Sequence, residues 1–261
     1  VRWTKSVRGD VVATLKERVR DGALVKGTFL NLGSPLVAEV LALSGFEWLL
    51  VDLEHGVRSE EALISQLLAG AAHQIPMLVR VESAQRIRVG HVLDLGADGV
   101  MFPRLNTPRE VREALSHLWY PPQGDRGVAG YNRARLFGGD GRESATVNAS
   151  LLGLVQIETL PALENVSSIA AIPGVDVLFV GPSDLSTSMG IAGQFDAPEF
   201  TAALDKIVDA ARKANVAAGI LTADPGRVDA LYERGFTFIS VASDSALLRG
   251  AARTAASGEP L

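Results

Sequence analysis

The stretch GFEWLLVD at residues 45–52 says most about how this chain folds. A glycine follows a helical stretch, and a short apolar run then leads to an aspartate. Glycine takes the left-handed conformation that ends a helix at little cost. A run that is apolar on both faces suits a strand buried in a parallel sheet. The stretch therefore predicts a helix that leads into a buried parallel strand.

The same junction recurs at GADGVMFP (96–103), GVDVLFVG (174–181) and GFTFISVA (235–242). With the gaps filled, the sequence predicts strands near 24–30, 47–52, 76–81, 98–103, 152–158, 176–181, 216–221 and 236–241. Helices are predicted near 35–44, 59–72, 84–95, 107–118, 161–171, 199–214, 226–234 and 244–256. Eight strand-then-helix units without a break in composition favour a (β/α)₈ TIM barrel, a single domain over residues 1–261. A doubly wound open sheet is the alternative.

One segment, residues 119–150, interrupts the alternation of strands and helices. Loops between a helix and the next strand usually have about 2–6 residues, so this is a long insertion between the fourth helix and the fifth strand. It contains PPQGDRG at 121–127 and then Arg133 and Arg135. A functional loop and an idle surface excursion both remain open at this point.

Composition excludes several classes of function. The 261 residues carry a net charge of −5, which argues against nucleic acid or an anionic membrane as the main partner. The chain has no cysteine, so thiolate chemistry and disulfides are excluded. Its apolar runs are far too short to span a bilayer, and no targeting segment is recognisable. We expect a cytoplasmic protein that acts on small molecules.

Polar side chains close five of the predicted strands, at the end where a barrel of this kind gathers its reacting groups. They are Asp52-Leu53-Glu54-His55, Arg80-Val81-Glu82, Gln156-Ile157-Glu158, Gly181-Pro182-Ser183-Asp184 and Ser243-Asp244. We therefore expect carboxylates, one histidine and one arginine to converge on one rim.

Glu158 and Asp184 fall at the ends of neighbouring strands, which lie about 4.8 Å apart. Two carboxylates this close repel each other unless a cation or a shared proton lies between them. A pair of oxygen ligands suits Mg²⁺ or Mn²⁺ better than Zn²⁺. The alternative is that Glu158 caps the following helix and Asp184 caps a turn.

His55 and Arg80 are the other candidates at this rim. His55 follows a buried strand, and Asp52 lies three residues before it, where it could orient the ring of a general base. An ordinary loop histidine is the alternative. Arg80 ends an apolar strand, where an unpaired charge is costly. It either pairs with a carboxylate or binds a substrate oxyanion.

The five lysines, at positions 5, 16, 26, 206 and 213, are all predicted away from this rim. An enzyme that forms a Schiff base needs a lysine at the catalytic mouth. A metal that accepts electron density is the natural substitute.

Four motifs resemble those of the HpcH/HpaI aldolase family, which comprises class II pyruvate aldolases such as 4-hydroxy-2-oxoheptanedioate aldolase. In chain order they are VDLEHG (51–56), PPQGDRG (121–127), QIET (156–159) and FVGPSDLS (179–186). The resemblance runs from about Lys26 to Val241. It implies reversible aldol cleavage between a small 2-oxo acid, pyruvate or hydroxypyruvate, and an aldehyde, by way of an enolate stabilised by a divalent metal.

The resemblance also implies roles for individual residues. Glu158 and Asp184 would ligate Mg²⁺, Mn²⁺ or Co²⁺, and the 2-oxo acid would chelate this metal. Arg80 would hold the keto oxygen, Gln156 would contact the donor, and the backbone amides of Ser183 and Asp184 would receive its carboxylate. His55, oriented by Asp52, would move the proton of the aldol hydroxyl. We expect Leu221 and residues 128–130 to shape the acceptor pocket.

Asp94 matches an acidic position that the family places in its acid–base network. It lies in the last turn of its predicted helix, at the end of the barrel opposite the rim. Asp94 could therefore serve only the active site of another subunit, and we expect a homo-oligomer, with a hexamer favoured by the resemblance.

Three other functions remain as alternatives. An acyl-CoA lyase of the citrate lyase β-subunit type would need a basic cluster for nucleotide phosphates, which we do not find. A non-catalytic 2-oxo acid binding protein would need neither His55 nor Asp52. A sugar-phosphate isomerase would need a glycine-rich phosphate site after strands seven and eight, where Asp224 and Asp244 stand instead.

Overall fold

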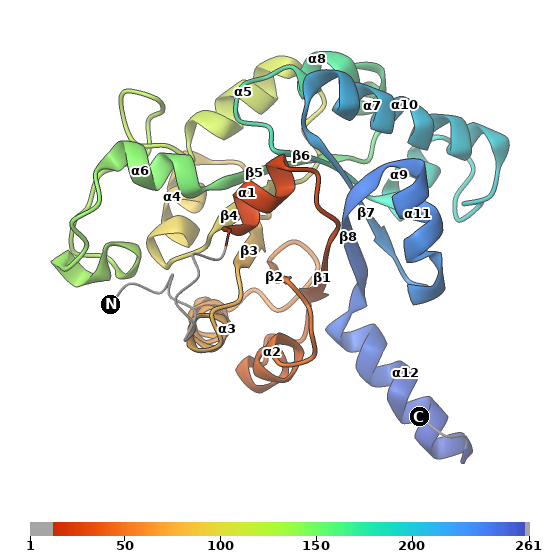
Figure 1. Cartoon of the computed structure of the whole chain (residues 1–261), viewed down its shortest axis with the longest axis horizontal. Helices are drawn as coiled ribbons and strands as arrows, with labels where there is room; N and C mark the ends of the chain where they lie inside the picture. The colour runs from red at the N-terminus through yellow and green to blue at the C-terminus, as the bar shows by residue number, and fades with distance from the viewer. Residues whose placement is uncertain (1–12, 259–261) are drawn as a thin grey trace.

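The computed structural model describes residues 13–258, and these residues form a closed barrel of eight parallel strands in sequence order (Figure 1). The strands are β1 (Val25–Leu30), β2 (Trp48–Asp52), β3 (Met77–Arg80), β4 (Gly99–Phe102), β5 (Leu152–Ile157), β6 (Val177–Val180), β7 (Ala217–Thr222) and β8 (Phe236–Ser243). β8 pairs with β1 and closes the barrel. The predicted TIM barrel is confirmed, and the open sheet is excluded.

The predicted helices are present with small shifts at their ends. They are α2 (Pro35–Ala42), α3 (Glu60–Ala72), α4 (Arg86–Asp94), α5 (Pro108–Ser116), α10 (Pro198–Ala214), α11 (Val228–Arg234), preceded by the 3₁₀ turn η2 (Pro225–Arg227), and α12 (Asp244–Ser257). The single helix predicted over 161–171 is wrong. It is divided at Asn165 into α7 (Leu160–Glu164) and α8 (Val166–Ala170). The Asn165 side chain donates to the carbonyl of Pro161 and competes with the regular helical pattern there.

Two short helices of the barrel were not predicted. α1 (Leu15–Arg20) begins with a capping box in which Thr14 and Glu17 bond each other's backbone amides. Leu15 and Val19 join the core inside the barrel, so α1 covers the N-terminal end of the strands. α9 (Pro182–Ser188) begins immediately after β6.

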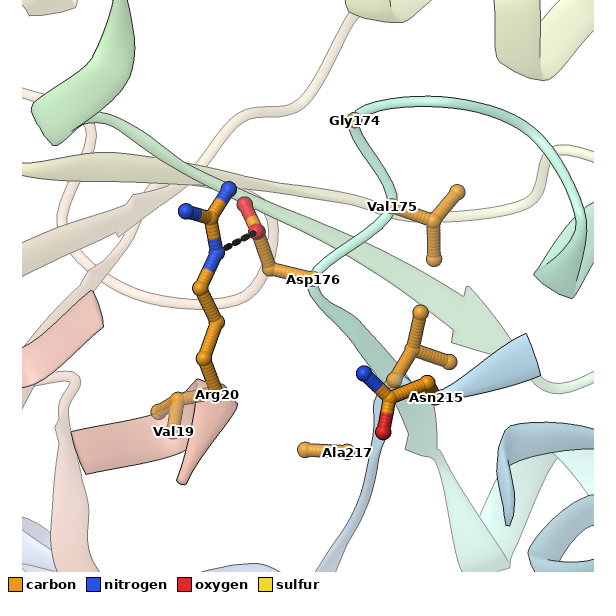
Figure 2. Close-up of a pocket in the computed structure, with 8 residues that line it drawn as sticks. Val19, Arg20, Gly174, Val175, Asp176, Asn215 and Ala217 are labelled. Carbon is orange, nitrogen blue, oxygen red and sulfur yellow. Dashed lines mark ion pairs between the residues drawn. The ribbon is translucent and has the colours of Figure 1, made fainter. Parts of the chain in front are cut away.

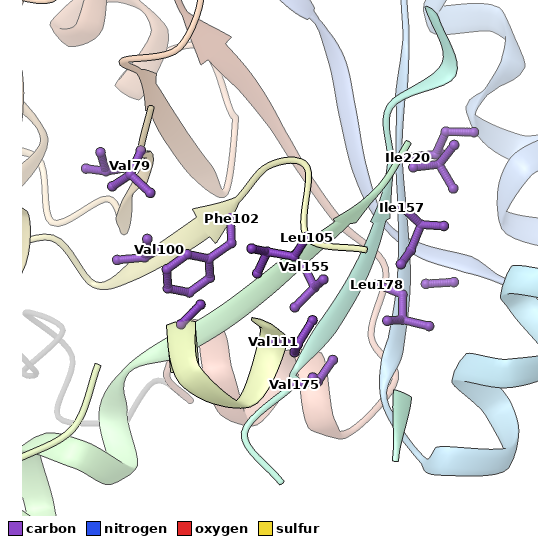
Figure 3. Close-up of a cluster of buried hydrophobic side chains, with 14 of the residues drawn as sticks. Val79, Val100, Phe102, Leu105, Val111, Val155, Ile157, Val175, Leu178 and Ile220 are labelled. Carbon is purple, nitrogen blue, oxygen red and sulfur yellow. The ribbon is translucent and has the colours of Figure 1, made fainter. Parts of the chain in front are cut away.

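The core has two layers, one on each side of the sheet. Outside the barrel, valines and leucines of the strands pack against helices, as Val100 and Val155 do near Val111 of α5 (Figure 3). Inside the barrel, aromatic rings fill the centre, and Trp48 stacks on Phe238 with ring centroids 4.3 Å apart. This filled interior means that chemistry must take place at an end of the barrel and not in a central channel.

A cavity of about 150 Å³ lies at the N-terminal end of the barrel. It is lined by α1 and by the starts of β6 and β7, and Arg20 Nε stands 3.9 Å from Asp176 Oδ1 at its edge (Figure 2). Lys16 bonds Asp176 at 3.0 Å and also the carbonyl of Leu151. These groups satisfy one another and secure α1 to the barrel.

The long segment at 119–150 is ordered and contains the 3₁₀ turn η1 (Arg133–Gly138) and the helix α6 (Ser144–Ser150). The Asn148 side chain anchors it, because it accepts from the backbone of Tyr120 and donates back to it, at 2.8 and 3.0 Å. Its tip exposes large apolar side chains, including Tyr131 and Phe137, which are 80% and 75% exposed.

The last helix, α12, extends away from the barrel instead of lying against it (Figure 1). Asp244, its first residue, is the only residue of this helix that is buried. Within the described residues, no helix is both long and apolar enough to cross a membrane.

Candidate active site

The polar ends of β2, β3 and β5 meet at the C-terminal mouth of the barrel, as the sequence predicts. Asp52 and Arg80 are the last residues of β2 and β3, and they lie directly opposite each other in the strand pairing. Gln156 lies in β5 with its side chain at the same end, and Glu158 follows that strand. The barrel thus places two carboxylates, an amide and a guanidinium within hydrogen-bonding reach of one another.

Asp52 is buried and accepts five hydrogen bonds from the described residues. Arg80 donates two of them, from Nε at 2.9 Å and from Nη2 at 2.7 Å. The others come from the Asn31 side chain at 2.9 Å and from the amides of Glu54 and His55 at 3.0 and 3.2 Å. Burial by itself would raise the pKa of Asp52, but the hydrogen bonds and charge of Arg80, with the two amides, hold this pKa below its ordinary value.

Arg80 is 7% exposed, and two carboxylates in contact with it, Asp52 and Glu54, compensate its charge. Besides the fork to Asp52, its Nη1 lies 3.2 Å from Glu54 Oε2 and 3.5 Å from Gln156 Oε1. The guanidinium also lies over the ring of Phe29, 5.1 Å from the centroid. Burial works against the charged form, but Asp52 and Glu54 outweigh it and raise the pKa of Arg80, which stays a cation.

Glu158 is 2% exposed and is held in a single orientation. Gln156 Nε2 donates to one carboxylate oxygen at 2.7 Å, and the backbone amide of Arg104 donates to the other at 2.7 Å. Burial raises the pKa of Glu158 to about 7; the Arg104 amide opposes this, and the charges of Glu54 and Asp184 add to it. A carboxylate in this state gains much from a nearby cation.

The alternative in which Glu158 caps the next helix is wrong, because Thr159 occupies that position. The Thr159 hydroxyl accepts from the amide of Ala162 at 3.2 Å at the start of α7. The Glu158 carboxylate faces the mouth of the barrel instead, beside Gly181. A Cβ at Gly181 would lie 3.0 Å from Glu158 Oε2, so glycine leaves room next to this carboxylate.

Ser183 and Asp184 lie in the first turn of α9, at the mouth. The charge of Asp184 adds to the raised pKa of Glu158, behind the larger effect of burial. No group of three or more histidine, aspartate or glutamate side chains with metal-binding geometry occurs among residues 13–258. The pair would therefore leave most positions around a cation to water and substrate, and its oxygen-only donors fit Mg²⁺, Mn²⁺ or Co²⁺.

His55 lies at the rim with its side chain 64% exposed. Asp52 binds the backbone amide of His55 and not its ring, so the expected orientation of the ring by Asp52 is not formed. The ring Nε2 lies 4.0 Å from Glu54 Oε2 instead. Leu221, near the end of β7, is half-buried and packs against the core inside the barrel.

Asp94 is the last residue of α4, at the end of the barrel opposite the mouth, as predicted. There it accepts a hydrogen bond from Arg126 Nη2 at 2.7 Å. Arg126 is buried and stacks over the ring of Tyr120, 4.4 Å from the centroid. The structure thus joins Asp94, which we expected to serve a neighbour, to the PPQGDRG motif, and Arg126 offsets the unfavourable position of an acid at a helix C-terminus.

Lysines are absent from the mouth in the described part of the chain. Lys16 is buried at the N-terminal end, Lys26 is exposed on β1, and Lys206 and Lys213 lie on α10. Lys5 lies outside the described residues.

Sequence reasoning missed Asn31 and Arg104 as parts of the site, and it placed Glu54 at the rim without giving it a role. Glu54 is part of the VDLEHG motif. Its carboxylate contacts Arg80 and, together with Asp52, compensates the positive charge of the guanidinium. Arg104 has a φ of 55°, a left-handed conformation that turns its amide toward Glu158. No residue type in the sequence signals this amide, because any residue but proline carries one.

The chain belongs to the HpcH/HpaI aldolase/citrate lyase family, whose model matches residues 26–251. A hydroxypyruvate/pyruvate aldolase from Paraburkholderia phytofirmans is 40% identical over 247 residues, which cover 92% of this chain and 95% of that protein. A 2-keto-3-deoxy-L-rhamnonate aldolase from Salmonella gallinarum is 35% identical, with 89% and 87% covered. The crystal structure of a family protein from Burkholderia cenocepacia superimposes with a TM-score of 0.90 at 37% identity, covering 94% of this chain and 98% of that one.

Proposed function

We propose that this protein is a class II aldolase that cleaves and forms a carbon–carbon bond between a small 2-oxo acid and an aldehyde. The observation that carries the proposal is the buried row of Asp52, Arg80, Gln156 and Glu158 across the mouth of the barrel. In this row the Arg80 guanidinium can stabilise a developing oxyanion. The Glu158 carboxylate in the same row is suited to bind a metal. The named activities of the relatives support the same reaction.

The chemistry of Glu158 and Asp184 suits a divalent cation, because both offer carboxylate oxygens at the mouth. Glu158 is buried with a pKa raised to about 7, and the charges of Glu54 and Asp184 raise this pKa while that of Arg80 lowers it. We infer that Glu158 and Asp184 hold Mg²⁺, Mn²⁺ or Co²⁺. When bound, the cation would supply Lewis-acid chemistry that favours the enolate form of the 2-oxo acid.

Protein side chains perform the remaining steps in this proposal. Arg80 stabilises negative charge on the keto oxygen, and the backbone amides of Ser183 and Asp184, in the first turn of α9, receive the donor carboxylate. In the direction of cleavage, His55 removes the proton of the aldol hydroxyl. The carbon–carbon bond then breaks, the aldehyde leaves, and the bonding electrons remain on the enolate, which afterwards takes up a proton at carbon.

Pyruvate and hydroxypyruvate are the donors that we propose, following the names of the relatives. Gln156 would contact the donor, because its amide already stands between Arg80 and Glu158. Leu221 would contact the acceptor from β7.

We further propose that the enzyme is a homo-oligomer, with six subunits favoured, in which Asp94 and the segment around Arg126 complete the site of a neighbour. Both residues lie at the end of the barrel away from their own mouth. The apolar side chains of Tyr131 and Phe137 face solvent, and α12 leaves its own barrel (Figure 1). Contact with other subunits would cover these surfaces.

Metal removal tests the proposed function. Aldol cleavage should disappear after exhaustive chelation and return with Mg²⁺, Mn²⁺ or Co²⁺. A panel of 2-oxo acid donors against several aldehydes would identify the substrates. Full activity after chelation, or capture of the substrate on a lysine by borohydride, would refute a class II mechanism.

A further inference from the structure

Asn31, immediately after β1, links Asp52 to a second buried carboxylate. Its Nδ2 donates to Asp52 Oδ2 at 2.9 Å. Its backbone amide donates to Asp244 Oδ1 at 2.8 Å, and the next amide, of Leu32, donates to Asp244 Oδ2 at 3.0 Å. Asp244 is 2% exposed and begins α12. Both of its oxygens are therefore used to hold the loop that carries Asn31.

The hydrogen bond from Asn31 holds Oδ2 of Asp52, whereas the backbone amides of the described residues bond Oδ1. Oδ1 accepts from the amides of Glu54 and His55 as well as from Arg80. Oδ2 accepts from the side chains of Arg80 and Asn31. The terminal torsion of an aspartate is broad, and without Asn31 the described residues would leave Oδ2 bound by Arg80 alone. The carboxylate could then tilt about its amide-bonded Oδ1 and carry the guanidinium with it.

We propose that Asn31 and Asp244 are positioning residues for the reaction. They hold the Asp52 carboxylate in one orientation, and Asp52 in turn places Arg80 against the keto oxygen. This inference rests on the role of Arg80 in the proposed function. Asn31 acts through Asp52, and Asp244 acts through Asn31.

Kinetics of Asn31→Ala provide the first test, with Leu32→Ala on the same loop as the matched control. Arg80 contacts charge that grows in the transition state, so its misplacement should lower kcat more than it raises KM. We expect kcat to fall about 10- to 100-fold, with KM for the 2-oxo acid changed by no more than about threefold. Leu32→Ala should keep the parent kcat. A parent-like kcat in Asn31→Ala, or an equal loss in both variants, would overturn the proposal.

A second measurement is independent of activity. The Nε–H of Arg80, bonded to Asp52 at 2.9 Å, should give an NMR signal protected from solvent exchange, identified by its absence in Arg80→Lys. Asn31→Ala should accelerate its exchange at least about tenfold, Asp244→Asn should act in the same direction, and Leu32→Ala should leave it unchanged. Unaltered exchange in Asn31→Ala would refute the positioning role. If the parent enzyme shows no aldol cleavage but the exchange changes as expected, the proposed function fails and the positioning of Arg80 stands.

Discussion

Glu158→Gln should change the stability of the metal-free protein in a way that reverses with pH. Glu158 is buried, and its pKa is raised from the ordinary value of 4.5 to about 7. The folded protein therefore binds this proton more tightly than the unfolded chain does. The contribution of Glu158 to the free energy of unfolding of the parent protein therefore falls as pH rises from about 4.5 to about 7, and it is constant above that range. Glutamine does not titrate, so residue 158 of the variant contributes no such decrease in the free energy of unfolding.

The size of the effect follows from the two pKa values. Their difference corresponds to about 3 kcal/mol at pH 8. Against this, the new amide group faces the donating Nε2 of Gln156, and the lost hydrogen bond costs about 1 kcal/mol at every pH. The Arg104 amide keeps an acceptor. We expect the variant to be about 1 kcal/mol less stable than the parent near pH 4.5 and about 2 kcal/mol more stable near pH 8.

Equilibrium urea unfolding with a chelator present, at a series of pH values, measures this difference. Glu164→Gln, the same change at an exposed position of α7, is the control and should show no such reversal. At pH 8, Mn²⁺ should raise the unfolding midpoint of the parent and leave that of Glu158→Gln unchanged. A stability difference that does not vary with pH would refute the raised pKa, and an equal response of both proteins to Mn²⁺ would refute Glu158 as a ligand.

Three further results are expected. His55→Ala should lower the rate of aldol cleavage about 10²–10⁴-fold and slow exchange of the donor's methyl protons much less; equal losses would remove His55 as the base for the hydroxyl. Mixing inactive His55→Ala subunits with inactive Asp94→Asn subunits should restore some activity, and no recovery after confirmed subunit exchange would exclude Asp94 acting in trans. Gly27→Ala should destabilise the barrel by about 3 kcal/mol or more in urea unfolding, because its Cβ would overlap the Trp48 indole; an unchanged midpoint would show that Trp48 repacks without cost.

The barrel could be predicted from the sequence because its signals are local. Four strands, β2, β4, β6 and β8, are short apolar runs after a helix-ending glycine, as at Gly45, and these features depend on neighbouring residues alone. The ends of such strands meet at one face in any closed parallel barrel. For that reason the convergence of Asp52, Arg80, Gln156 and Glu158 was also predictable.

The tertiary structure decided which of these groups bind one another. Asp52 was expected to orient the ring of His55, three residues away, but it binds Arg80, which faces it from the next strand. A bidentate pair between buried charges is worth more than a contact to an exposed ring, and only the strand register reveals it. The anchoring of Asp52 by Asn31 and Asp244 joins residues up to 213 positions apart in the chain. No local pattern encodes such contacts, because they exist only once the barrel has closed between β8 and β1.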